Sequence, residues 1–293
     1  MLLLDLKCTP FSLDCTLGCG QVFRWHKDND TWIGVVEGHV LRIRHIENRL
    51  EVVATPDDVD DVFVQRYLRL DDDLPRILGD IGRDEVIREA IQTLIGLRLV
   101  RQEAWECLAS YICASFNNIS RIRGIVNRLG QRFGHDIRGD PMLQSFPSAS
   151  VLSKSTCQEL EACGLGYRAP YLLDSAIAIA EGLIDLESLK RAPYEDAKAE
   201  LMKLPGVGNK VADCVCLFAL DKLDAFPVDV WIRRIIVANY SAHLSTMEGF
   251  LSLKPWHYRQ INAFGRSYFG RYCGYAQQYL YARYSKVLAT KRT

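Results

Sequence analysis

Two ionisable side chains, Lys210 and Asp229, occur in a segment whose spacing suits covalent chemistry. A neutral lysine amine can attack an electrophilic carbon, and the positive end of a helix beginning beside Lys210 favours the neutral form. Cys214 follows Lys210 by four residues, so both side chains are expected on one helical face. Asp229 precedes an apolar run and is expected to cap a helix, where its ionised carboxylate would stabilise a nearby cation.

A glycine-rich turn, residues 204–208 (Leu-Pro-Gly-Val-Gly), precedes this lysine and separates a helical pattern over residues 194–203 from a second helix. Its two glycines allow positive φ and close approach of the backbone to a ligand. The unpaired N–H groups at the start of the second helix attract anions. We therefore expect a phosphate site formed by Gly206, Val207, Gly208 and Lys210. Considered alone, the turn could also be an ordinary helix–helix connection with glycine caps, which is the less favoured alternative.

The distribution of charge supports a polyanionic partner. The whole chain has 36 Lys and Arg against 36 Asp and Glu, so its net charge is zero. Residues 201–293 hold 13 basic and 5 acidic residues, an excess of 8 positive charges, and the acidic excess lies around residues 57–89. The basic third contains the glycine turn, which favours nucleic acid as a partner, although a chance asymmetry is the alternative.

Length, composition and cysteine usage limit the class of protein. A chain of 293 residues with 48% apolar and 25% charged residues is typical of a globular protein with one large or two to three small domains. Its 10 cysteines include no C-x-x-C pair and no C-terminal four-cysteine loop, so we expect no iron–sulfur cluster. The apolar start, residues 1–4, is too short for a secretory signal, and no apolar run could span a membrane. We therefore expect an intracellular protein with reduced thiols.

The apolar periodicity predicts an antiparallel sheet followed by helices. Strands are expected over residues 31–54, where Leu41 and Ile43 alternate with arginines and turns fall at Gly38 and Asn48. Asp57-Asp58 and Asp84 are expected to cap the first two helices. The ranges expected to be helical are 59–68, 85–94, 102–115, 119–133, 150–152, 156–163, 171–180, 194–203, 230–240, 256–266 and 272–288.

Taken together, the turn, Lys210 and Asp229 resemble the helix-hairpin-helix signature of base-excision DNA glycosylases, in their lysine-bearing bifunctional branch. Over most of its length the chain is similar to the 8-oxoguanine DNA glycosylases of the eukaryotic type. The segments that carry this resemblance are Gly20–Trp25, Arg98–Gln102, Glu106–Leu108, Phe116–Ile122, Gly164–Ala169, Leu204–Cys216, Pro227–Val230 and Gly274–Gln277.

The resemblance implies excision of 8-oxoguanine from duplex DNA. The damaged base would be extruded, because C1′ and the base edge cannot be reached within the duplex. Lys210 would attack C1′, displace the base and form a Schiff base that permits β-elimination of the 3′ phosphate. Asp229 would stabilise the cationic sugar and help to move protons.

The resemblance also implies a lesion-base pocket. Gly20 would offer its carbonyl to the N7–H of the extruded base, a donor that 8-oxoguanine has and guanine lacks. Gln277 would bond the Watson–Crick edge. Tyr281 and Cys214 would pack against the two faces of the base.

A further group is implied at the opposite strand, where this chain departs from the family. Tyr167 would wedge into the base stack, while Arg168 and Arg121 would read the orphaned cytosine. The family's loop usually holds three asparagines, but Phe116 occupies the first place here, beside Asn117. An apolar ring can only stack or fill the gap, so we expect weaker selectivity for cytosine opposite the lesion.

A second departure lies beside Asp229. Trp231 replaces a histidine that in the family lies near this aspartate and the DNA backbone. We expect less polar surroundings for Asp229 and the loss of one phosphate contact.

These inferences predict an α+β architecture with an N-terminal antiparallel sheet packed on two mostly helical domains. The expected domains are residues 1–94 (sheet with helices), 95–117 plus 209–293 (catalytic face), and 118–208 (ending in the hairpin). The expected partner is double-stranded DNA containing an oxidised purine, with a monomeric protein in the cytoplasm, nucleoid or nucleus. No cofactor is required, and the family allows a structural cation at the hairpin.

Two alternatives remain from sequence. One is a glycosylase for alkylated purines, or for a broad range of oxidised bases, on the same scaffold. The other is a helix-hairpin-helix protein that binds DNA without catalysis. The preferred opposite base and the ratio of lyase to glycosylase activity are open.

Overall fold

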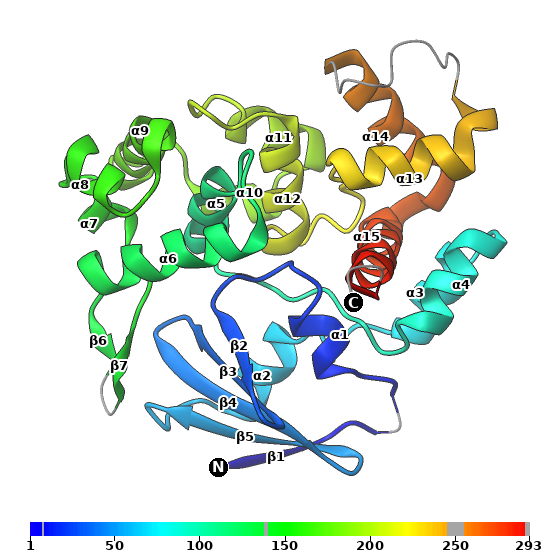
Figure 1. Ribbon diagram of the computed structural model, residues 1–293, viewed down its shortest axis with the longest axis horizontal. Helices are drawn as coiled ribbons and strands as arrows, with labels where there is room; N and C mark the ends of the chain where they lie inside the picture. Colours follow the sequence, from blue (N-terminus) through cyan, green and yellow to red (C-terminus); the bar gives the residue numbers. More distant parts are fainter. Residues whose placement is uncertain (8, 138–139, 245–254, 291–293) are drawn as a thin grey trace.

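A computed structural model describes residues 1–7, 9–137, 140–244 and 255–290. It has an N-terminal antiparallel sheet below a larger helical layer, as Figure 1 shows, which confirms the expected α+β class. The five strands lie in the order β1-β5-β4-β3-β2. Their bounds are β1 Leu2–Asp5, β2 Trp25–Asp28, β3 Thr31–Val36, β4 His39–Ile46 and β5 Arg49–Thr55.

The three central strands occupy the region where alternation predicted them. Strand β3 pairs with β4, with Trp32 opposite Ile43, and β4 pairs with β5. The β3–β4 turn places Glu37 and Gly38 at φ of 47° and 82°, the left-handed pair that a two-residue hairpin needs. The outer strands β1 and β2 were not predicted, because a four-residue strand carries little alternation.

Two short helices lie next to the sheet, α1 (Leu13–Leu17) and α2 (Asp61–Tyr67). The prediction that Asp57-Asp58 caps α2 is wrong. The cap is Asp60, whose side chain accepts from the amide of Phe63 at 2.8 Å.

The helical layer follows the expected ranges closely. Helices α6 (Ile119–Phe133) and α13 (Val230–Tyr240) begin and end at the predicted residues. Asp84 caps α4 (Glu85–Thr93), as predicted. Helices α1, α3 (Leu74–Ile81) and α10 (Leu186–Arg191) were not predicted. A small two-stranded sheet, β6 (Asp136–Ile137) with β7 (Asp140–Gln144), was missed as well. The remaining helices are α3 Leu74–Ile81, α4 Glu85–Thr93, α5 Ala104–Cys113, α6 Ile119–Phe133, α7 Ala149–Leu152, α8 Cys157–Ala162, α9 Ala169–Ala180, α10 Leu186–Arg191, α11 Tyr194–Leu201, α12 Asn209–Ala219, α13 Val230–Tyr240, α14 Pro255–Phe269 and α15 Cys273–Thr290.

One apolar core runs through the helical layer, and a separate core fills the space between the sheet and its two helices. Residues of α3 and α4, such as Ile77 and Ile87, belong to the helical core. These helices contact α15, and the predicted domain bounds stay predictions. No described helix combines the length and apolarity that crossing a bilayer requires.

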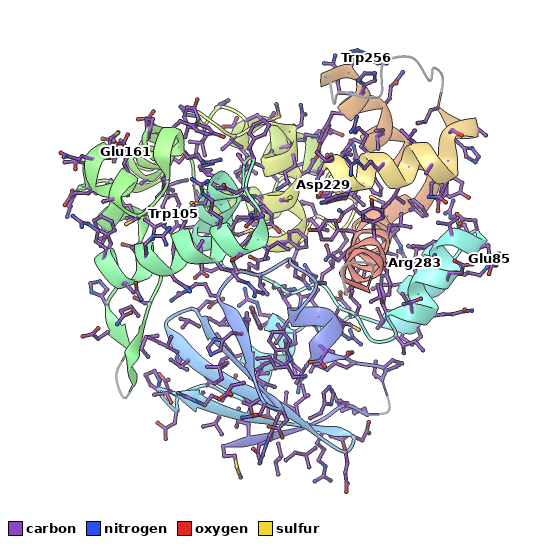
Figure 2. The ribbon with its side chains drawn as sticks, viewed as in Figure 1. Glu85, Trp105, Glu161, Asp229, Trp256 and Arg283 are labelled. Atoms are coloured by element: carbon purple, nitrogen blue, oxygen red, sulfur yellow. The ribbon has the colours of Figure 1, made fainter. Side chains whose placement is uncertain are left out.

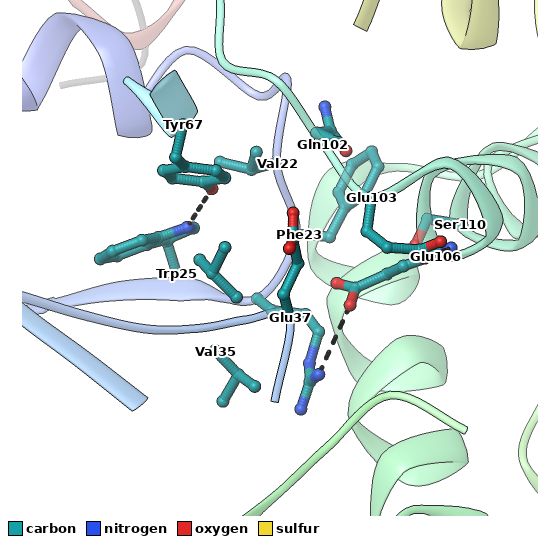
Figure 3. Close-up of a pocket in the computed structure, with 12 residues that line it drawn as sticks. Val22, Phe23, Trp25, Val35, Glu37, Tyr67, Gln102, Glu103, Glu106 and Ser110 are labelled. Carbon is teal, nitrogen blue, oxygen red and sulfur yellow. Dashed lines mark hydrogen bonds and ion pairs between the residues drawn. The ribbon is translucent and has the colours of Figure 1, made fainter. Parts of the chain in front are cut away.

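The sheet meets the helical layer at a small buried seam, which Figure 3 shows in close-up. The Trp25 indole donates to the Tyr67 hydroxyl at 2.7 Å. Glu106 of α5 lies 3.7 Å from the Arg24 guanidinium, and burial raises its pKa to about 7 against the pull of that arginine. Glu103 caps α5 by accepting from the amides of Trp105 and Glu106. The seam fixes the segment that follows Gly20 against α5.

Candidate active site and DNA-binding surface

Lys210 is the second residue of α12, immediately after the hairpin. Its Nζ lies 4.8 Å from the centroid of the Tyr111 ring, which stacks on Phe218 at 5.7 Å. No sequence pattern indicates this aromatic support, because Tyr111 occupies one more position of the mostly apolar helix α5. The ring limits where the amine can move within the cavity.

Cys214 lies one turn further along α12, as its spacing predicts. Its side chain is buried, and burial raises the pKa of the thiol to about 12 although Lys210 acts in the opposite direction. The thiol is therefore neutral at physiological pH and offers an apolar surface rather than a nucleophile.

Asp229 caps α13, as predicted. Its Oδ1 accepts hydrogen bonds from the amides of Trp231 at 3.0 Å and Ile232 at 2.8 Å. We expected the cap to keep the carboxylate ionised, but burial raises its pKa above the ordinary value, and the Ile232 amide and Lys210 only partly offset this. Figure 2 shows Asp229 near the start of α13, and the residue is half-buried. The carboxyl is thus held close to Lys210 in a desolvated setting.

An open cavity of about 850 Å³ lies beside these residues. The structure brings the four residues of the expected lesion-base pocket to its wall, from both ends of the chain and from α12, whereas Arg121, Tyr167 and Arg168 are not among the residues that line it. The expected residues that line it are Gly20, Cys214, Gln277, Tyr281, Phe116, Asn117, Gly206, Gly208, Lys210 and Asp229. These residues share one cavity wall, and their individual roles stay predictions.

Gly20 enters this wall with φ of +86°, a conformation that glycine adopts without strain. A Cβ there would lie 2.9 Å from Cδ1 of Ile119. The next residue anchors the loop: Gln21 Nε2 donates to the Thr16 carbonyl at 2.8 Å and its Oε1 accepts from the Val100 amide at 3.0 Å. The backbone at Gly20 is therefore held by a buried side chain.

Gln277 projects from α15 into the same wall and is 5% exposed. Its Oε1 has no hydrogen-bond partner among the described groups. A buried amide oxygen without a partner costs free energy, which a bound donor would recover. This oxygen is suited to accept from an N–H of a bound base.

The loop before α6 carries the expected opposite-strand residues. Phe116 is 97% exposed at φ of +52°, so its ring projects into solvent. Asn117 turns inward, where Nδ2 donates to the Cys113 carbonyl at 2.8 Å. Asn118 caps α6 by accepting from the amide of Arg121, whose own side chain is exposed.

Tyr167 and Arg168 differ in orientation. Tyr167 is 55% exposed, in keeping with a wedge. Arg168 is buried: Nε donates to the Ser115 carbonyl at 2.8 Å and Nη1 to the Leu165 carbonyl at 3.1 Å. Its guanidinium lies 4.2 Å from the Tyr167 ring. In this conformation the Arg168 side chain is hydrogen-bonded to the backbone carbonyls of residues 115 and 165. It would have to break these hydrogen bonds in order to contact a cytosine directly.

The hairpin has the expected helix–turn–helix form, and one of its residues is internally engaged. Gly206 has φ of +77°, and a Cβ there would lie 2.6 Å from the Tyr171 ring. Val207 is buried and its amide donates to the Leu204 carbonyl at 3.1 Å. Val207 was expected to bind phosphate, but its amide is occupied, which leaves Gly206, Gly208 and the first turn of α12.

The rim of the cavity near Asp229 is aromatic. The Trp231 ring lies 5.0 Å from that of Tyr284 on α15, and the Arg234 guanidinium lies 4.7 Å from the Trp231 centroid. The less polar surroundings expected from Trp231 stay a prediction, since a charged guanidinium also lies on this ring. Tyr284 was not anticipated, since its sequence neighbours give no sign of this contact.

No metal or other cofactor is expected from these side chains. Within the described ranges, no group of three or more His, Cys, Asp or Glu residues converges as a metal site would require. The absence of a required cofactor stays a prediction, as does a cation at the hairpin.

Comparison with known proteins identifies the class and then the family. Residues 109–248 match the HhH-GPD superfamily of base excision DNA repair proteins, and residues 3–108 match the N-terminal domain of 8-oxoguanine DNA glycosylase. The chain belongs to the 8-oxoguanine DNA glycosylase family within the helix-hairpin-helix superfamily.

Two curated relatives and one solved structure illustrate this similarity. The chain is 33% identical to N-glycosylase/DNA lyase OGG1 of Arabidopsis thaliana, over 95% of this chain and 78% of the relative. It is 33% identical to the N-glycosylase/DNA lyase of Saccharomyces cerevisiae, over 91% and 81%. The Clostridium acetobutylicum 8-oxoguanine glycosylase/lyase, bound to duplex DNA with cytosine opposite the lesion, matches with a TM-score of 0.85 and 29% identity, over 95% and 93%.

Proposed function

We propose that this protein excises 8-oxoguanine from duplex DNA and then cleaves the strand as a lyase. One observation carries the proposal: Lys210, Asp229, Gly20 and Gln277 share the wall of a single cavity. Family membership and the named activities of the relatives support it.

The chemistry begins with the extruded nucleotide in the cavity. The neutral amine of Lys210 forms a bond to C1′ while the glycosidic C–N bond breaks, and the base leaves with the bonding electrons and takes up a proton. Asp229 stabilises the positive charge that develops on the sugar. Opening of the sugar ring gives a Schiff base, and loss of a C2′ proton then expels the 3′ phosphate by β-elimination.

Lesion choice rests on two acceptors. The Gly20 carbonyl meets N7–H of 8-oxoguanine but would face the N7 lone pair of guanine, and this mismatch disfavours the normal base. The unpaired Oε1 of Gln277 accepts from the Watson–Crick edge. Tyr281 and the neutral thiol of Cys214 enclose the two faces of the base.

Duplex DNA would lie across the hairpin and the exposed loops at Phe116 and Tyr167. Glycine backbones and the N-terminal turn of α12 hold a phosphate, while the two exposed rings reach the base stack. We expect a monomer that acts on DNA inside the cell, and size-exclusion chromatography with light scattering tests the oligomeric state.

Borohydride trapping on a duplex containing 8-oxoguanine opposite cytosine tests the function. Wild type should form a covalent adduct, and Lys210→Gln should form none. Lys203→Gln is the matched control, since Lys203 is an exposed lysine just before the hairpin, and it should trap like wild type. No adduct with wild type, or an undiminished adduct with Lys210→Gln, would leave a DNA-binding protein without this chemistry.

Substrate choice is tested by comparing excision from duplexes carrying 8-oxoguanine, an alkylated adenine or an oxidised pyrimidine. The proposal requires the highest kcat/KM for 8-oxoguanine. Equal or faster excision of the others would favour the broader glycosylase.

A further inference from the structure

A buried carboxylate lies directly behind the catalytic face of α12. Asp213 follows Lys210 by three residues and precedes Cys214, and its side chain is 0% exposed. The described residues that line the cavity include Lys210 and Cys214 but not Asp213. Its influence on a bound nucleotide must therefore pass through other residues.

Four side chains from two helices donate to this carboxylate. From α11, the Tyr194 hydroxyl donates to Oδ1 and Lys198 Nζ to Oδ2 at 3.0 Å. From α14, the Tyr258 hydroxyl and Asn262 Nδ2 donate to Oδ2, the latter at 3.0 Å. Burial raises the pKa of Asp213, while Lys198 and the two hydroxyls lower it. Because a buried carboxylate needs such donors in place of water, the network holds α11, α12 and α14 in one arrangement.

The two donors from α14 also bind the backbone just ahead of Asp229. The amide of Val228 donates to the Tyr258 oxygen at 3.2 Å, and Asn262 Nδ2 donates to the carbonyl of residue 226 at 2.9 Å. Tyr258 has a single hydroxyl proton, which goes to the buried carboxylate, so its oxygen lone pairs remain for the Val228 amide. The orientation of this hydroxyl thus depends on an acceptor at position 213.

We propose that Asp213 is a positioning residue that sets the separation between Lys210 and Asp229. It connects α12, which carries the nucleophile, through two side chains of α14 to residues 226–228, which deliver the aspartate. The inference rests on the function proposed above. A shift of about 1 Å between reacting groups can cost about a hundredfold in rate, so a rigid link of this kind has kinetic consequences.

The test uses a matched pair of tyrosine variants, because replacing Asp213 itself could prevent folding. Tyr258→Phe and Tyr194→Phe each remove one hydroxyl that donates to Asp213, but only Tyr258 also binds the backbone of residue 228. The measurements are the thermal midpoint, the dissociation constant for an 8-oxoguanine duplex, and the single-turnover excision rate with saturating enzyme. Wild type and Lys210→Gln are run beside them.

Tyr258→Phe should slow single-turnover excision about tenfold or more while its dissociation constant stays within about twofold of wild type. Tyr194→Phe should excise within about twofold of wild type, even if its thermal midpoint falls equally. If the two variants lose excision rate in equal measure, the network serves stability alone and the positioning role is wrong. If wild type itself fails to excise or trap, the proposed function fails, and this inference fails with it.

Discussion

The side-chain amide of Gln278 donates to Cys19 Sγ at 3.1 Å, across 259 residues of sequence. Each partner adjoins a residue that faces the cavity, since Cys19 precedes Gly20 and Gln278 follows Gln277. This buried contact joins the two ends of the chain at the point where both proposed acceptors for the damaged base are presented.

Removing that contact should weaken lesion discrimination. Gln278→Leu keeps the volume of the side chain but removes one of the two donors to Cys19 Sγ, leaving only the longer bond from Gln21 at 3.4 Å, at a cost of about 1 kcal/mol. We expect the preference for an 8-oxoguanine duplex over an undamaged duplex to fall several-fold, measured as the ratio of dissociation constants. Gln131→Leu, at an exposed position of α6, is the control and should leave the ratio unchanged. An unaltered ratio in Gln278→Leu would mean that the Gly20 loop keeps its place without Gln278.

Adding a methyl group at Gly20 should abolish excision without unfolding the protein. Gly20→Ala forces a non-glycine residue to φ of +86° and brings its Cβ to 2.9 Å from Ile119. Gly38→Ala has the same kind of strain at φ of +82°, in an open turn with no atom within 4 Å. Both should lose about 1–2 kcal/mol of stability, measured by denaturant unfolding. Only Gly20→Ala should lose excision, and equal activity in the two variants would count against a base-contacting role for Gly20.

Replacing Phe116 should sharpen the choice of opposite base. Phe116→Asn restores an amide that can hydrogen-bond a cytosine, and asparagine tolerates φ of +52° better than phenylalanine does. We expect wild type to excise the lesion at similar rates opposite cytosine, adenine and thymine, and the variant to prefer cytosine. The thermal midpoint should not fall, because the ring is 97% exposed and contributes little packing. The same preference in both proteins would show that Phe116 does not set selectivity.

Neutralising Asp229 should stabilise the protein while it removes activity. Burial raises the pKa of Asp229, so ionisation costs the folded state free energy, and this cost grows as the pH rises through the unfolded and then the folded pKa. Asn is an equally good cap. Asp229→Asn should therefore have a thermal midpoint above wild type at pH 7.5, and the difference should shrink at acidic pH.

Asp60→Asn supplies the comparison, because Asp60 caps α2 at an exposed position. Its thermal midpoint should stay near that of wild type at both pH values. A midpoint for Asp229→Asn below wild type at pH 7.5 would mean that attraction to Lys210 outweighs burial.

Where a helix has strong local sequence signals, its first and last residues could both be predicted. Helix α6 has an amphipathic pattern between Asn118 and Gly134, and α13 follows a capping aspartate, so local physics alone sets their ends. Strand β1 is different, because its four residues become a strand only by pairing with β5, which lies far along the chain.

The site shows the same division. The residue types and spacing of Lys210 and Asp229 indicate their chemistry, so these two site residues could be predicted from the sequence. The Tyr111 ring beneath the lysine and the inward turn of Arg168 depend on packing between separate elements. No local pattern encodes such contacts.

Helix α15 completes the cavity, and this has a consequence for a growing chain. Synthesis delivers the hairpin, the nucleophile and the capping aspartate before residue 273, at which α15 begins. A ribosome-bound chain of that length already contains the residues of the proposed phosphate site and the reactive amine, yet it lacks the second acceptor, Gln277, and one of the two donors to Cys19, Gln278. The pocket for the extruded base is therefore completed last, when the C-terminal helix docks.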